Sequence, residues 1–130
     1  MSRNRFLQPE IVRIALSEEE WIEIKKELNA GESRKQASLA MFPVMLDGKV
    51  VDRIDWSQYE LLRANLWLTA WHLHDSAGNV PKLSLDALRA LDVETFEEIN
   101  NAIFKHIMET IELKKASKNP SGTNLDQISS

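Results

Sequence analysis

Large apolar residues recur every three or four positions in the last third of the chain, which is the spacing of one face of an α-helix. The stripe consists of Phe96, Ile99, Ile103, Ile107 and Ile111. Asp92 stands where an N-cap side chain is expected, and charged and amide residues occupy the opposite face. The sequence therefore predicts an amphipathic helix that packs one face on a core. The rest of the chain must supply an apolar surface of matching length.

Residues 55–74 are rich in apolar and aromatic side chains, and their spacing predicts a long helix. Asp55, with Gln58 three positions later, predicts its N-cap. Apolar residues fall on several of its faces, so we expect a central helix that is buried on most sides and ~30 Å long. Gly78 is expected to end this region in a left-handed conformation, and Ser84 to cap a short helix after it.

Two smaller elements are expected between these long segments and the N-terminus. Asn29 with Glu32 predicts a cap for a helix over about residues 31–42, which must end before Pro43. The dipeptide at residues 47–48 (DG) lies between two apolar runs, which is a hairpin-turn signal. This piece is predicted to be a small two-stranded ribbon, or a loop that imitates one.

Residues 10–28 support two interpretations. Val12, Ile14 and Leu16 alternate with other residues, as in a half-buried strand. Residues 17–28 show the same alternation in part, yet Ser17 with Glu20 resembles a capping box, and apolar side chains also follow a helical spacing. The pattern favours a helix for residues 17–28, and a strand stays open as the alternative.

Length and composition limit the classes of protein that this chain can belong to. A chain of 130 residues fits one domain, and we expect a loose lead-in over residues 1–9, a domain over 10–117 and a disordered polar tail over 118–130. The absence of cysteine excludes disulfides and thiolate metal sites and favours a reducing compartment. The net charge of −4 opposes binding to nucleic acid or to a membrane surface. Neither a signal peptide nor a membrane span is predicted, so the chain is expected to be cytoplasmic.

The sequence contains no constellation that indicates catalysis. Three histidines are present, and the two at His72 and His74 would point apart on a helix, so they are not expected to share a metal. Glycine-rich phosphate loops and nucleophile or zinc-protease motifs are missing. We therefore expect no enzyme activity, no cofactor and no metal.

The four tryptophans are the candidate binding residues. Trp67 and Trp71 lie four positions apart, on one face of the expected central helix. They are either core aromatics or an exposed patch for a protein partner, since tryptophan is enriched both in cores and at interface hot spots. Trp21 and Trp56 complete the candidate partner-binding set.

Several segments occur in the order found in one known family. A strand-like opening at residues 10–17 (EIVRIALS) leads to residues 21–32 (WIEIKKELNAGE). An aromatic segment ends at residues 66–71 (LWLTAW), and residues 75–81 (DSAGNVP) then precede residues 84–92 (SLDALRALD). Over about residues 10–113, this set resembles the tail assembly chaperones of long-tailed bacteriophages and prophages. The family usually has an Asp-Gly-type turn where this chain has Ser-Glu-Glu-Glu.

The resemblance implies a fold, a function and partners. The implied fold is mostly α, of the α+β class. A small N-terminal β-hairpin or ribbon would pack on a bundle of about four helices, with the long aromatic-rich helix at its centre. The implied function is to bind the tape-measure protein, keep it soluble and help recruit tail-tube subunits in the cytoplasm of the bacterial host. Such a protein would be absent from the mature virion.

Two alternatives stay open beside this interpretation. The chain could be a structural protein of the phage tail, or another non-catalytic protein-binding module. Homo-oligomer formation is also open, because composition alone does not decide it.

Overall fold

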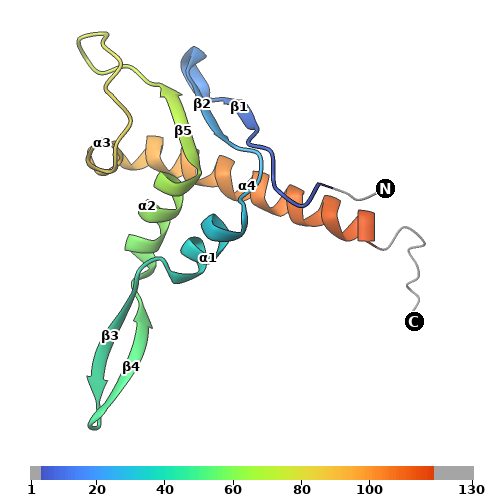
Figure 1. The fold of residues 1–130 in the computed structure, drawn as a ribbon. Coiled ribbons are helices and arrows are strands. Elements are labelled where there is room, and N and C mark those ends of the chain that lie inside the picture. Colours follow the sequence, from blue (N-terminus) through green and yellow to red (C-terminus); the bar gives the residue numbers. More distant parts are fainter. Residues whose placement is uncertain (1–3, 119–130) are drawn as a thin grey trace, which may run out of the picture.

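A computed structural model of the chain describes residues 4–118, and it shows a mixed α/β fold with two separate antiparallel sheets (Figure 1). A three-stranded sheet lies along the longest helix, and a two-stranded ribbon extends away from the body of the molecule. The elements in chain order are β1 (Ile11–Ala15), β2 (Trp21–Lys25), α1 (Ala30–Ser38), β3 (Met41–Leu46), β4 (Lys49–Ile54), α2 (Trp56–Trp67), β5 (Leu68–His72), α3 (Leu85–Arg89) and α4 (Val93–Lys118).

The three-stranded sheet has the order β1-β2-β5, and both pairs of strands are antiparallel. Ile22 and Ile24 of the central strand are fully buried, and Ile22 lies opposite Trp71 of β5. Successive strand residues point to opposite faces, so these two isoleucines share the face that meets α4. The register shifts between Glu23 and Ile24, which is a β-bulge or irregularity in the middle of the sheet.

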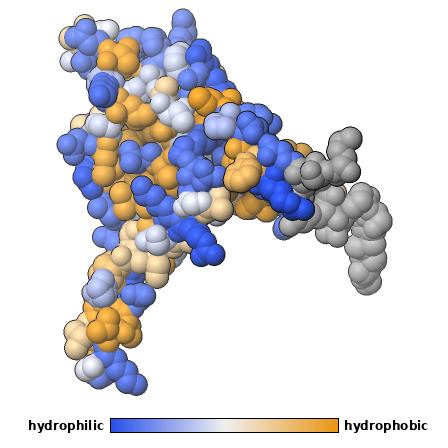
Figure 2. Space-filling view, viewed as in Figure 1, coloured by the Kyte–Doolittle hydropathy of each residue, from blue (hydrophilic) through white to orange (hydrophobic). Residues whose placement is uncertain are grey.

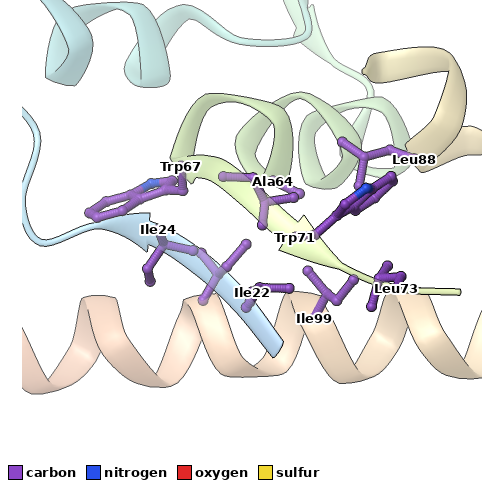
Figure 3. Close-up of a cluster of buried hydrophobic side chains, with 10 residues drawn as sticks. Ile22, Ile24, Ala64, Trp67, Trp71, Leu73, Leu88 and Ile99 are labelled. Carbon is purple, nitrogen blue, oxygen red and sulfur yellow. The ribbon is translucent and has the colours of Figure 1, made fainter. Parts of the chain in front are cut away.

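The core lies between this sheet, α2, α3 and α4 (Figure 3). The predicted stripe of the last helix supplies Ile99 and Ile103, and both have no exposed surface. Each buried side chain of this size contributes roughly 1.5–3 kcal/mol to folding. The other buried members are Ile22, Ile24, Ala64, Trp67, Leu68, Trp71, Leu73 and Leu88. The amphipathic helix predicted from the stripe is therefore confirmed, and only the last residue of the stripe, Ile111, is exposed among its five members.

The helix favoured for residues 17–28 is wrong, because residues 21–25 form the central strand β2. Ser17 and Glu20 do not form a capping box. They are the outer residues of a tight turn between β1 and β2, whose central residues Glu18 and Glu19 have φ angles of 56° and 61°. Positive φ at both central positions matches the type I′ turn that joins antiparallel strands. The short β-hairpin is present, and two glutamates form its turn.

The long central helix is also wrong, because α2 ends at Trp67 and the chain continues as strand β5. Trp71 and Leu73 are both buried and two residues apart, so the apolar pattern of this stretch fits a strand as well as a helix. The edge of β2 that does not pair with β1 decides in favour of a strand, because it offers backbone hydrogen bonds and the contacts of two buried isoleucines. The expected bundle of about four helices is accordingly replaced by a sheet packed on α4.

The other cap and turn predictions are confirmed, but the helix predicted over about residues 31–42 is shorter: α1 ends at Ser38, Ala40 has a φ angle of 60°, and residues 41–46 form β3. Asn29 and Glu32 form a capping box at the start of α1, with both reciprocal hydrogen bonds in place. Asp55 accepts a hydrogen bond from the backbone N–H of Gln58 at 3.2 Å, and so caps α2. Side-chain oxygens of Ser84 and Asp92 cap α3 and α4 in the same way. Gly78 has a φ angle of 83°, and the hairpin signal at residues 47–48 corresponds to the β3–β4 turn.

The predicted chain ends are only partly within the described residues. The expected lead-in over residues 1–9 is described from residue 4, and Phe6 within it is exposed. Helix α4 continues to Lys118, and the rest of the tail predicted for 118–130 lies outside the described residues. Within residues 4–118, none of the helices has the length and apolar character needed to cross a membrane.

Candidate partner-binding surface

Two of the four candidate tryptophans lie in the core. Trp67 and Trp71 are buried, and each indole N–H has a partner inside the protein. Trp67 Nε1 donates to Oε1 of Gln36 at 2.6 Å, and Trp71 Nε1 donates to the carbonyl oxygen of Pro81 at 2.7 Å. Figure 3 shows both rings among the aliphatic side chains of the sheet and α4. Because both indoles are enclosed and paired, they stabilise the fold and offer little surface to a partner.

The other two tryptophans are more accessible. Trp21 is half-buried and lies between the guanidinium of Arg13, 3.7 Å from its ring, and the stacked ring of His72 at 5.3 Å. Trp56, the first residue of α2, is 67% exposed and contacts Tyr59 edge-on. Of the four candidates, Trp56 alone presents most of its surface to solvent.

A larger apolar surface lies directly before Trp56 in the chain. Strands β3 and β4 and their turn, residues 41–54, form a ribbon that we name the arm; Figure 1 shows it extending away from the body of the molecule. Asp47 and Gly48 have φ angles of 50° and 75°, so the arm closes in a type I′ turn. At its base, the backbone N–H of Asp55 donates to the carbonyl oxygen of Ala40 at 3.2 Å.

The strand register places two different sets of side chains on the two faces of the arm, because directly opposed residues share a face and successive residues alternate. We name one the methionine face; its residues are Met41, Pro43, Met45, Val50, Asp52 and Ile54. We name the other the basic face; its residues are Phe42, Val44, Leu46, Lys49, Val51 and Arg53. Both faces are mainly apolar, and apolar patches over the arm are visible in Figure 2.

The tip of the methionine face is the most exposed apolar part of the arm. Met45 is 67% and Val50 is 68% exposed, and the two are a directly opposed pair. A two-stranded hairpin alone is at best marginally stable in water, and apolar patches on monomers usually mark sites of contact with other molecules. The arm therefore has the character of a binding element that becomes covered in a complex.

A groove lies beside the base of the arm, between the N-terminal half of α2, α3 and the start of α4. Its volume is about 550 Å³. Leu88 at its floor is almost fully buried, whereas Val93 at its border is 72% exposed. The remaining lining residues are Ser57, Glu60, Leu61, Arg89, Leu91, Phe96, Glu97, Asn100 and Asn101.

A smaller apolar stripe follows the partly exposed side of α4. Phe104, Met108 and Ile111 are all exposed, and their spacing of four and three residues places them on one side of the helix. The guanidinium of Arg63 lies 5.7 Å from the Phe104 ring, so the stripe borders the body of the molecule. It is a second, narrower apolar surface.

The structure brings His72 and His74 together, contrary to the prediction that they point apart. Their rings meet edge-on at 4.6 Å because this segment is extended and not helical. His74 Nδ1 lies 3.5 Å from Oε2 of Glu20. Within residues 4–118, no group of three or more His, Cys, Asp or Glu side chains is arranged to hold a metal ion.

The resolved pKa shifts belong to helix N-termini. Hydrogen bonds from Ser57 and Gln58 lower the pKa of Asp55, and hydrogen bonds from Thr95 lower the pKa of Asp92. The ammonium of Lys25 and the backbone of Asn29 lower the pKa of Glu32. In each case the carboxylate is held in its charged form by bonds that stabilise a helix end. These groups serve the fold and lie outside the two apolar faces of the arm.

Sequence reasoning did not identify the arm as a binding surface. The signal was present, because apolar residues occupy both alternating positions on either side of the turn at residues 47–48, which leaves neither face polar. Comparisons of the chain with protein-family models, with curated proteins and with solved structures find no match.

Proposed function

We propose that this protein is a non-catalytic protein-binding module and acts as a tail assembly chaperone of a long-tailed phage or prophage. It would bind the tape-measure protein, keep it soluble and help recruit tail-tube subunits in the bacterial cytoplasm. The observation that carries the proposal is the outstretched arm with apolar side chains on both faces. The sequence resemblance supplies the identity of the client.

The methionine face suits a client of this kind. A tape-measure protein is a long helical chain that exposes extended apolar stripes until it is packed in the tail. Unbranched methionine side chains adapt to irregular apolar surfaces, and they are frequent on surfaces that bind many related sequences. Met41 and Met45 both lie on this face, and Trp56 at the base of the arm adds a large aromatic anchor. Many copies along one client would add avidity.

The proposal is tested by co-expression with a fragment of a tape-measure protein from the same phage. The wild-type chain should keep the fragment soluble and co-purify with it in 1 M salt, because apolar contacts are little affected by screening. The double variant M45S/V50S, which makes the tip of the methionine face polar, should lose the fragment. W56A should weaken binding by about 2 kcal/mol if the indole is an interface anchor.

The matched control is V80S/L113S, which also removes two exposed apolar side chains but lies outside the arm. It should bind like the wild type. Equal loss of binding in both double variants would mean that general surface hydrophobicity, and not the arm, holds the client. If no fragment binds and purified tails contain this chain, the structural-protein alternative replaces the chaperone.

A further inference from the structure

The basic face of the arm carries a pattern of charge that the methionine face lacks. Lys49 and Arg53 lie on it, beside the apolar side chains of Phe42 and Leu46. The described residues contain no ion pair of either cation with an acid. An apolar surface with two free cations fits an apolar groove with an acidic border.

The groove beside the arm base has this complementary character. Its floor is apolar, and its border carries Glu60, Glu97 and Arg89. The guanidinium of Arg89 lies 3.9 Å from a carboxylate oxygen of Asp86, so its charge is partly balanced within α3. Neither glutamate forms an ion pair within residues 4–118, so the border is acidic.

We propose that the basic face of the arm of one molecule docks in this groove of a second copy of the same chain. Arm and groove lie at the same end of α2, since Ile54 ends the arm, and Ser57 and Glu60 line the groove. A two-fold arrangement therefore lets each copy contribute an arm and receive one. The strands of the arm are ~20 Å long at about 3.3 Å per residue. The two arm–groove contacts of the dimer together reach the buried area of a standard protein–protein interface if each contact buries about 800 Å² of surface in total.

Docking of the basic face in the groove is favoured over edge-to-edge pairing of the arms of two copies. In a hairpin with a two-residue turn, the residues that flank the turn, here Leu46 and Lys49, form a hydrogen-bonded pair. Hydrogen-bonded and non-hydrogen-bonded pairs alternate along the strands, and Pro43 lies three positions before Leu46. Pro43 therefore belongs to a non-hydrogen-bonded pair, and its nitrogen faces the outer edge of β3. Proline has no N–H and blocks that edge.

The outer edge of β4 is also unsuited to pairing with its own copy. In the two antiparallel registers that overlap most and retain hydrogen bonds, Asp52 lies opposite Asp52, or Lys49 lies opposite Arg53, of the second copy. Each arrangement brings like charges together, which destabilises strand pairing. A second copy is therefore better received by the basic face than by either edge.

The dimer is independent of the client, because the two faces of the arm have different occupants. The methionine face points away from the groove when the basic face is docked, since side chains on a strand alternate. A docked arm would thus be held in a fixed position and would still present Met45 and Val50. Self-association can be measured on the purified chain alone, so its failure would leave the client proposal standing.

The test uses charge reversal and sedimentation velocity at several concentrations. Variant K49E/R53E reverses the arm cations, and variant E60K/E97K reverses the acids of the border. The wild type should dimerise, and each variant alone should have a dimer dissociation constant at least about tenfold higher, since like charges then meet. An equimolar mixture of the two variants should dimerise again, because both arm–groove contacts then join opposite charges.

The matched control for K49E/R53E is R34E/K35E, which makes the same change in net charge on exposed positions of α1 outside the arm and groove. It should dimerise like the wild type. Thermal melting of every variant establishes that the fold is retained. A monomeric wild type at all concentrations would overturn the proposal. So would a mixture of the two variants that stays monomeric, or a control that loses the dimer to the same degree.

Discussion

The single residues of the turn between β1 and β2 explain why the helix favoured for residues 17–28 is wrong. They also offer a position where a substitution should stabilise the protein. Glu18 and Glu19 both have positive φ angles in the turn between β1 and β2. Residues other than glycine and asparagine are costly there, by roughly 1–2 kcal/mol each. Tertiary contacts hold the turn nevertheless, because Glu98 of α4 accepts hydrogen bonds from the backbone N–H of Ser17 at 2.9 Å and from its hydroxyl at 3.1 Å.

Replacing Glu19 by glycine should therefore stabilise the protein. Glycine adopts positive φ without a clash of its Cβ, and a gain of about 1 kcal/mol in the free energy of unfolding is expected, measured by urea denaturation. Glu19→Ala serves as the control, since it removes the same charge but keeps a Cβ at this φ angle. A glycine variant no more stable than the alanine variant would mean that the turn is not strained.

At the scale of elements, the two hairpins have different supports. The β1–β2 hairpin is part of a sheet that packs on α4, whereas the two strands of the arm pair with no third strand among residues 4–118. Stability within a protein varies with local burial, so the arm should open without unfolding of the core. Its turn depends on Gly48, whose φ angle of 75° disfavours any residue with a Cβ.

Replacing Gly48 by alanine should loosen the arm and leave the core intact. We expect faster hydrogen exchange at residues 41–54 and an unchanged exchange rate in β2 and β5, measured by mass spectrometry. Gly31→Ala is the matched control, because a Cβ there would meet the Asn29 side-chain oxygen at an ordinary 3.6 Å within a helix. That variant should stabilise α1 by roughly 0.5–1 kcal/mol. Loss of exchange protection throughout the molecule in G48A would show that arm and core unfold together.

At the scale of the whole molecule, the parts that the sequence predicts are those with local signals. Helix caps at Asn29, Asp55 and Ser84, the stripe of α4 and the turn at residues 47–48 each depend on neighbours in the chain. The wrong assignments depend on contacts between distant segments. Residues 68–72 form a strand because β2 offers an edge for pairing, and no local pattern reports such an edge.

The features of the candidate site also divide into those that the local sequence predicts and those that depend on contacts between distant segments. The sequence includes Trp56 among the candidates and predicts the turn of the arm, but it centres the candidate site on Trp67 and Trp71, whose burial depends on how the sheet meets α4. The apolar residues of the arm are visible in the sequence, yet whether their faces are covered depends on the position of the ribbon relative to the body. That position is a property of the complete fold.

If the arm holds the client, a bound client should cover it. Hydrogen exchange of the chain with and without a bound tape-measure fragment locates the covered surface. Protection on binding is expected to be concentrated in residues 41–56, and exchange in the sheet and in α4 should change little. Protection confined to the exposed apolar stripe of α4 at Phe104, Met108 and Ile111, with exchange in the arm unchanged, would place the client on α4 and not on the arm.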